Sequence, residues 1–327
     1  MKLFSVLMLL LLSTTVLAED VYGLRQYTFE EGMDYLNLIS NSAASESRDE
    51  NYVQCSNLYK KPIANGIIDI RYALGYFDLS EGAEFIWEGE NFGISPSLDI
   101  GVYQGLIRLL TAPCPRRANR QLCEFQISGS SQPAKTILQK RINLLGHNVT
   151  TQITLTHASV SQFYKDNVGP LAADQQQLTA QSENNFFNAI GVADIVLYNG
   201  HSRSGGGPDF SPPRLNSELH TDYKQYYSVQ KPGLKKLLAA LKRNSKNEGV
   251  LGLLSCSSKS HFYSTIMKAN SNQRLIVSSD FVEYNDSIKA SLGYLEGFLQ
   301  GQCGNQLEET AKQEAIIKTG FFGINLN

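Results

Sequence analysis

Two residues that could do chemistry each follow an apolar run in this chain. His201 comes directly after "VLYNG" (196–200), and Cys256 comes directly after "GVLGLLS" (249–255). A cysteine thiolate is a strong nucleophile, and a neighbouring histidine is its usual partner in proton transfer. The two residues therefore predict acyl transfer, in which Cys256 attacks a carbonyl carbon and His201 moves the proton.

The residues around Cys256 favour a reactive thiol. Ser255, Ser257 and Ser258 keep its surroundings polar, and the helix expected after it would bring a positive end close to the sulfur. Backbone N–H groups of Ser202 and Cys256 could then form the oxyanion hole. The alternative is a buried, inert cysteine, which is the usual fate of a lone cysteine on a strand.

The stretch after the strand can also be compared with a serine hydrolase motif. Gly200 and Ser202 match the beginning of G-x-S-x-G, but Ser204 stands where the second glycine belongs. That motif also requires a helix directly after the serine, and "SGGGPDFSPPR" (204–214) cannot begin one. The hydrolase order places the histidine last, whereas His261 precedes the candidate acid. We therefore expect the glycines to form a mobile rim over a site built on His201.

Several other polar residues have two interpretations each. Arg203 could bind a substrate carboxylate or hold the loop, and Asp209 and Asp280 would suit a basic P1 side chain or cap local structure. His220 and His261 are less favoured alternatives to His201 as the base. The histidines lack metal-ligand spacing and there is no paired CxxC, so we expect no metal and no cofactor.

The elements that must position His201 and Cys256 alternate between short apolar strands and helices. This alternation predicts an α/β fold with a mainly parallel sheet flanked by helices. In such sheets ligands bind beyond the carboxyl ends of the strands, where both residues lie. The expected strands cover residues 193–198, 249–255 and 274–279, and the expected helices cover 183–190, 232–244 and an amphipathic stretch from 286 onward.

The first half of the chain is less regular. Residues 135–145 and 149–158, with "GHN" (146–148) between them, predict a β-hairpin, and 149–156 alternates as a half-exposed strand would. Residues 101–110 have helical spacing. We interpret 19–123 as an N-terminal accessory region and 124–327 as the α/β domain.

The beginning of the chain predicts export. Residues 1–18 combine one lysine, an apolar core and a Val-Leu-Ala ending, which is typical of a cleaved signal peptide. We therefore expect a periplasmic or extracellular protein in which disulfides can form. Cys114 and Cys123 lie nine residues apart and predict a disulfide loop, while Cys55 and Cys303 could pair or stay reduced.

Composition narrows the choice of partners. The chain has 29 basic and 31 acidic residues and no basic tract, which argues against nucleic acid and anionic membranes. After the signal peptide, no stretch approaches the roughly 20 apolar residues of a membrane span. The sequence indicates no oligomeric state.

Taken together, a strand ending in His201 and a later strand ending in Cys256 resemble the caspase–haemoglobinase fold of cysteine peptidases. This group includes caspases, legumains, gingipains, clostripain and separase, and the distant resemblance covers roughly residues 130–300. It implies a caspase-like domain acting on peptide or protein substrates, with His201 as the base and Cys256 as the nucleophile.

Two positions depart from the family pattern. Ser202 replaces the glycine after the histidine, and Ser255 replaces the alanine before the cysteine. The caspase sequence Q-A-C-x-G is absent, which excludes a caspase proper. The alternative is a catalytically silent binding or scaffold protein of the cell envelope that keeps the fold and uses the glycine-rich loop as a partner surface.

Overall fold

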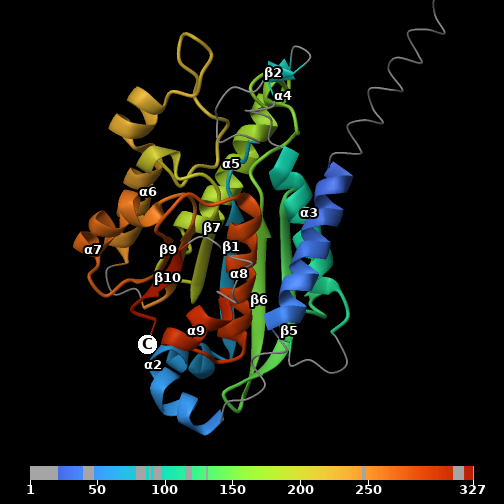
Figure 1. Cartoon of the computed structure of the whole chain (residues 1–327), viewed down its shortest axis with the longest axis vertical. Helices are drawn as coiled ribbons and strands as arrows, with labels where there is room; N and C mark the ends of the chain where they lie inside the picture. Colours follow the sequence, from blue (N-terminus) through green and yellow to red (C-terminus); the bar gives the residue numbers. More distant parts are fainter. Residues whose placement is uncertain are drawn as a thin grey trace, which may run out of the picture.

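A mixed β-sheet forms the centre of the molecule (Figure 1). The computed structural model describes residues 21–39, 48–78, 86–87, 90–91, 97–114, 120–129, 132–244, 248–311 and 320–326. Within these ranges the sheet has eight strands in the order β10-β9-β8-β7-β1-β6-β5-β4. Five neighbouring strands are parallel: β9 (Arg274–Ser278), β8 (Val250–Leu254), β7 (Ile195–Asn199), β1 (Ile67–Leu74) and β6 (His147–Thr156).

Antiparallel pairs complete the sheet on both sides. β5 (Lys135–Leu144) pairs with β6 and β4 (Gln126–Ile127) with β5, while β10 (Phe321–Ile324) pairs with β9. The α/β class and the mainly parallel sheet are thus confirmed, as is the hairpin, which β5 and β6 form. The short strands β2 (Ile86–Trp87) and β3 (Glu90–Asn91) pair separately.

β1 lies between β6 and β7, inside the sheet. The interpretation of residues 19–123 as an accessory region missed this strand. Its sequence, "IIDIRYAL", contains Asp69 and Arg71, whose side chains pair at 2.7 Å, so it lacks the continuous apolar run that marked β7 and β8. The region therefore supplies a central strand of the sheet.

One face of the sheet is covered by several helices, of which α8 (Tyr284–Leu299) lies closest to the site. The expected apolar side of α8 is buried, but so is every other residue from Ser287 to Leu299. The side of α8 that was expected to face solvent is covered by another helix, formed by residues 21–39. Glu31 of that helix lies 2.6 Å from Lys289 of α8. The other helices of this face are α2 (Arg48–Asn65), α3 (Ser97–Thr111) and α9 (Gly304–Ala311).

The opposite face carries α5 (Ala172–Phe187), α6 (Pro232–Arg243) and α7 (Ser264–Ala269). The predicted helix at 232–244 is α6. The helix predicted at 183–190 is only the end of α5, because the earlier turns of α5 are polar and lack an apolar period. The remaining short helices are α4 (Tyr164–Asn167), η3 (Arg203–Gly205), η4 (Tyr223–Gln230) and η5 (Lys259–Tyr263).

The end of β6 is buried on both sides, contrary to the expected half-exposed strand. Thr154 and Thr156 are buried because Asn185 of α5 covers them. The Asn185 amide donates to the Thr154 carbonyl at 3.0 Å and to the Thr156 hydroxyl at 3.1 Å. These hydrogen bonds explain how polar side chains can occupy buried positions.

Two disulfides join the described cysteines. Cys114 pairs with Cys123, as predicted, and Cys55 pairs with Cys303. Cys256 keeps its thiol. In the described part of the chain, every helix falls short of the length and apolar character that crossing a membrane requires.

Candidate functional site

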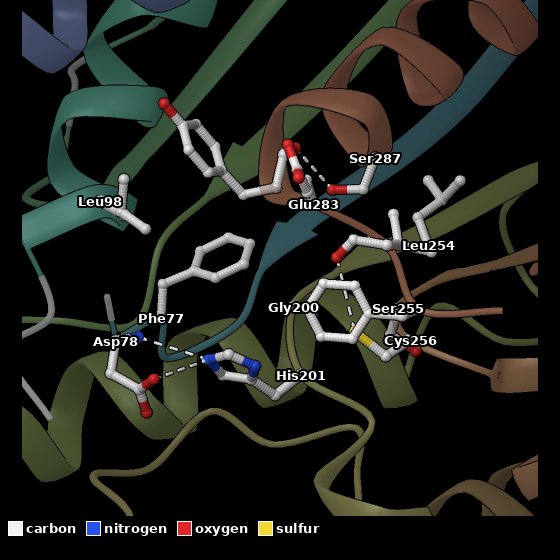
Figure 2. Close-up of a pocket in the computed structure, with 13 residues that line it drawn as sticks. Phe77, Asp78, Leu98, Gly200, His201, Leu254, Ser255, Cys256, Glu283 and Ser287 are labelled. Atoms are coloured by element: carbon white, nitrogen blue, oxygen red, sulfur yellow. Dashed lines mark hydrogen bonds and ion pairs between the residues drawn. The ribbon is translucent and has the colours of Figure 1, made fainter. Parts of the chain in front are cut away.

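Asp78, His201 and Cys256 follow the carboxyl ends of three neighbouring parallel strands. These strands are β1, β7 and β8, which lie side by side in the sheet. All three residues line one pocket of about 280 Å³ (Figure 2). Because parallel strands end at the same edge of the sheet, residues distant in sequence meet there.

The His201 ring is fixed by the Asp78 carboxylate. His201 Nε2 lies 3.1 Å from Asp78 Oδ1, and both residues are buried. The Asp78 backbone N–H also lies 3.5 Å from Nε2, but the shorter, charge-assisted contact assigns the proton to Nε2. The other ring nitrogen, Nδ1, faces the side of the pocket that holds Cys256 (Figure 2). An acceptor nitrogen therefore points toward the thiol.

Cys256 is half-buried, and its thiol donates to the Val282 carbonyl at 3.5 Å. The segment that carries Val282 is tied to the same strand end, since the Ser257 N–H donates to the Asp280 carbonyl at 2.7 Å. η5 begins soon after the cysteine and continues into α7, where the sequence predicted a helix. The nucleophile candidate thus sits on a short, well-anchored turn between a strand and a helix.

Sequence reasoning missed Asp78. The residue ends the stretch "YALGYFD" (72–78) and belongs to no recognisable motif. Its proximity to His201 depends on β1 and β7 being neighbours in the sheet. Recognising β1 as a strand would have been the signal, because its carboxyl end then falls at the same edge as His201.

Arg203 contacts Asp78 on the side of its other oxygen and is 1% exposed. Its guanidinium contacts Asp78 Oδ2 at 3.1 Å, Asp209 Oδ2 at 3.3 Å and the Tyr76 carbonyl at 3.3 Å. Burial acts to lower the pKa of Arg203, but Asp78 and its other neighbours outweigh it and raise that pKa. Of the two roles open to Arg203, the structure places it in the second: it holds the loop.

Comparisons of the chain with models of protein families, with curated proteins and with solved structures give no match. The chemistry of the site therefore has to be argued from its own residues. Across the described ranges, no three histidine, cysteine or acidic side chains gather where they could hold a metal ion.

The two acids suggested for a basic P1 side chain lie elsewhere. Asp209 Oδ2 accepts hydrogen bonds from Tyr227 at 2.8 Å and from Arg203 at 3.3 Å. The Asp280 carboxylate accepts from the Phe281 N–H at 2.8 Å. Neither residue lines the pocket. Both carboxylates hold backbone or buried side chains, as capping residues do.

The glycine-rich loop is packed rather than a mobile rim, which corrects the expectation. Gly205, Gly206 and Gly207 are buried. A Cβ on Gly206 would lie 2.5 Å from the Tyr227 carbonyl oxygen, and Gly205 has a φ of +84°. Glycine is therefore required here for close approach and for a left-handed backbone.

The remaining candidates are placed around the site. Ser202 is buried directly before η3, and only Cys256 of the two expected oxyanion residues lines the pocket. His261 lies against Gly205, and burial together with Lys231 lowers its pKa. His220 is exposed in a turn. His201 is the histidine that shares the pocket with Cys256.

Proposed function

We propose that the chain is a caspase-like cysteine peptidase or closely related thiol hydrolase acting on peptide or protein substrates. The observation that carries the proposal is the placement of Asp78, His201 and Cys256 at three adjacent strand ends in one pocket. A nucleophile, a base and a group that orients the base are the parts that thiol catalysis requires. The family resemblance assigns the same roles to His201 and Cys256.

We further propose that the enzyme works after export. Two disulfides fit an oxidising compartment, and residues 1–18 have the pattern of a signal peptide. Cys256 stays a thiol in this setting because the other four cysteines pair among themselves.

Acylation begins when the thiol proton passes from Cys256 Sγ to Nδ1 of His201. The sulfur then attacks the scissile carbonyl carbon, an S–C bond forms, and the carbonyl electron pair moves to oxygen. The backbone N–H group of Cys256, which lines the pocket, donates to this oxyanion. As the tetrahedral intermediate collapses, the C–N bond breaks and the His201 imidazolium protonates the leaving amine.

Deacylation reverses these roles. His201 takes a proton from water, whose oxygen attacks the thioester carbonyl carbon. The S–C bond breaks, the acid product leaves, and the proton returns to the Cys256 sulfur. Throughout the cycle Asp78 keeps the proton on Nε2 of His201 and stabilises the imidazolium.

Thiol reactivity tests the dyad. Iodoacetamide should label Cys256 in the folded protein at pH 7 faster than it labels N-acetylcysteine. His201→Ala should slow this labelling at least about tenfold, because the thiolate loses its proton acceptor. His261→Ala is the matched control, since His261 lies outside the pocket, and it should label at the wild-type rate.

Turnover tests the rest of the proposal. The mature protein should cleave bonds in a denatured-proteome peptide library, and Cys256→Ala should cleave none. Slow labelling that is unchanged by His201→Ala, together with no cleavage, would instead identify a silent binding protein of the same fold.

A further inference from the structure

The pocket that holds Cys256 and His201 has apolar walls. They come from the end of β1, the start of α3, the end of β8 and the segment that leads into α8. The side chains that form them are Phe77, Leu98, Leu254, Phe281, Val282 and Tyr284. Leu98, Leu254 and Val282 are each at most 5% exposed, whereas Phe281 is 55% exposed, so the walls extend from the packed body of the protein to its surface.

The pocket offers little to balance a buried charge. Two acidic residues line it, Asp78 and Glu283. Both Asp78 oxygens are engaged, one by His201 and one by Arg203. Glu283 is exposed, where water screens its charge. A lysine, arginine or acidic side chain entering this pocket would lose its hydration without gaining a buried counter-ion.

Two residues with hydroxyl groups, Ser255 and Ser287, also line the pocket. Ser287 Oγ lies 2.8 Å from Asn199 Oδ1 and 2.8 Å from the Tyr284 carbonyl, so its proton already has acceptors. Ser255 is 2% exposed, and its Oγ has no hydrogen-bond partner among the described residues. The Ser255 hydroxyl can donate one hydrogen bond and accept up to two, which is too little to solvate an ionic side chain.

The geometry points to an apolar P1 specificity: the pocket takes a leucine, methionine or phenylalanine side chain next to the scissile bond. This inference rests on the proposed function, because it places the P1 carbonyl beside Cys256. A volume of about 280 Å³ is small for a whole ligand and suits one side chain. Burial of its apolar surface against the six wall residues supplies the binding preference.

A matched substrate series tests the preference directly. Peptidyl coumarin amides that differ only at P1 would carry leucine, methionine, phenylalanine, asparagine, aspartate, lysine or arginine. We expect kcat/KM for the three apolar residues to exceed the values for aspartate, lysine and arginine by at least about tenfold. A preference for lysine or arginine that Glu283→Gln abolishes would overturn the inference and assign P1 recognition to Glu283.

A substitution in the wall should change the preference. Leu98 lies in the first turn of α3, where a helix tolerates a carboxylate. Leu98→Asp should lower kcat/KM for the leucine substrate and raise kcat/KM for the lysine substrate at least about tenfold. Leu98→Asn adds polarity without charge, so it should lower kcat/KM for the leucine substrate without raising it for the lysine substrate. Equal lysine cleavage by the two variants would contradict the placement of P1 against Leu98.

Binding without turnover separates this inference from the proposed function. Chemical-shift titrations of Cys256→Ala with N-acetyl-leucinamide, N-acetyl-lysinamide and N-acetyl-aspartamide need no catalysis. Tighter binding of the leucine compound, with wild-type protein that cleaves nothing, would leave the apolar pocket standing and reject the peptidase. Cleavage after charged residues would support the peptidase and reject the apolar P1 specificity. Equal binding of all three compounds would overturn the pocket preference.

Discussion

At the scale of single residues, one carboxylate contacts two buried side chains, His201 and Arg203. Asp78 presents Oδ1 to His201 and Oδ2 to Arg203, each at 3.1 Å. The base of the proposed reaction and the anchor of the glycine-rich loop thus share one residue at the end of β1. Asp209 helps to hold Arg203 from its other side, with Oδ2 at 3.3 Å from Nε. This arrangement allows the two functions of Asp78 to be separated by experiment.

Asp78→Asn should reduce kcat for peptide cleavage by at least about 100-fold, because the base His201 loses the carboxylate that orients it. The amide can donate to the imidazole, which favours the tautomer with its proton on Nδ1, and it no longer stabilises the imidazolium. The measurement is steady-state cleavage together with the pH profile of Cys256 alkylation.

Asp209→Asn provides the matched control for Asp78→Asn. It removes the other acidic contact of Arg203 and leaves His201 untouched. It should lower the unfolding midpoint while kcat stays within about threefold of wild type, far from the loss expected for a base. If both variants lose activity equally, Asp78 acts through Arg203 and the loop and is not the residue that orients His201.

At the scale of elements, the strands that precede His201 and Cys256 could be predicted from the sequence, whereas the strand that precedes Asp78 could not. β7 and β8 are buried on both faces, so their sequences are continuous apolar runs up to Tyr198 and Leu254. β1 is just as central, but Asp69 and Arg71 lie in its middle and satisfy each other. No local pattern could reveal that Asp78 would meet His201, because that contact depends on strand order.

The packing of loops was equally hidden from the sequence. Three consecutive glycines predict flexibility when the loop is considered alone. The structure uses their small size instead, since Tyr227 packs against Gly206 and Arg203 is buried under the loop. The contact with Tyr227, which is distant in the sequence, therefore packs a loop whose own sequence predicts flexibility.

His157, which directly follows β6, should make the stability of the protein depend on pH. His157 is 7% exposed, and its ring packs against Tyr103 of α3 with ring centres 4.5 Å apart. Burial lowers the pKa of His157 to about 4. In the unfolded chain it titrates near 6.5. Between these values the unfolded state binds a proton that the folded state does not bind.

We therefore expect His157 to reduce the free energy of unfolding by about 3 kcal/mol as the pH falls from 7 to 4. Urea unfolding of wild type and of His157→Phe across this range measures the effect. The phenyl ring keeps the contact with Tyr103 and cannot titrate, so the stability difference between the two proteins should change by that amount. Parallel pH profiles would show that His157 is protonated in the folded state.

At the scale of the whole molecule, the two disulfides close loops of very different length. Cys114–Cys123 spans nine residues, whereas Cys55–Cys303 spans 248 and links α2 to the connection between α8 and α9. The Tyr59 hydroxyl adds a hydrogen bond from α2 to the Gln302 carbonyl beside that bridge. α2 leads into β1, which carries Asp78 at its end, and α8 begins at the wall of the pocket.

Because loop-closure entropy grows with the length of the closed loop, the two bridges should differ in their effect on stability. Replacing both cysteines of a pair by alanine should cost about 5 kcal/mol for Cys55–Cys303 and about 2.5 kcal/mol for Cys114–Cys123. Urea midpoints of the two double variants provide the comparison, and equal losses would contradict it.

The long bridge also restrains two elements that frame the site, so its loss should slow the selective alkylation of Cys256 at temperatures where the protein is still folded. The loop closed by the short bridge contacts α8 at Glu296, near the end of the helix that lies away from the pocket, so removing that bridge should change the alkylation rate much less.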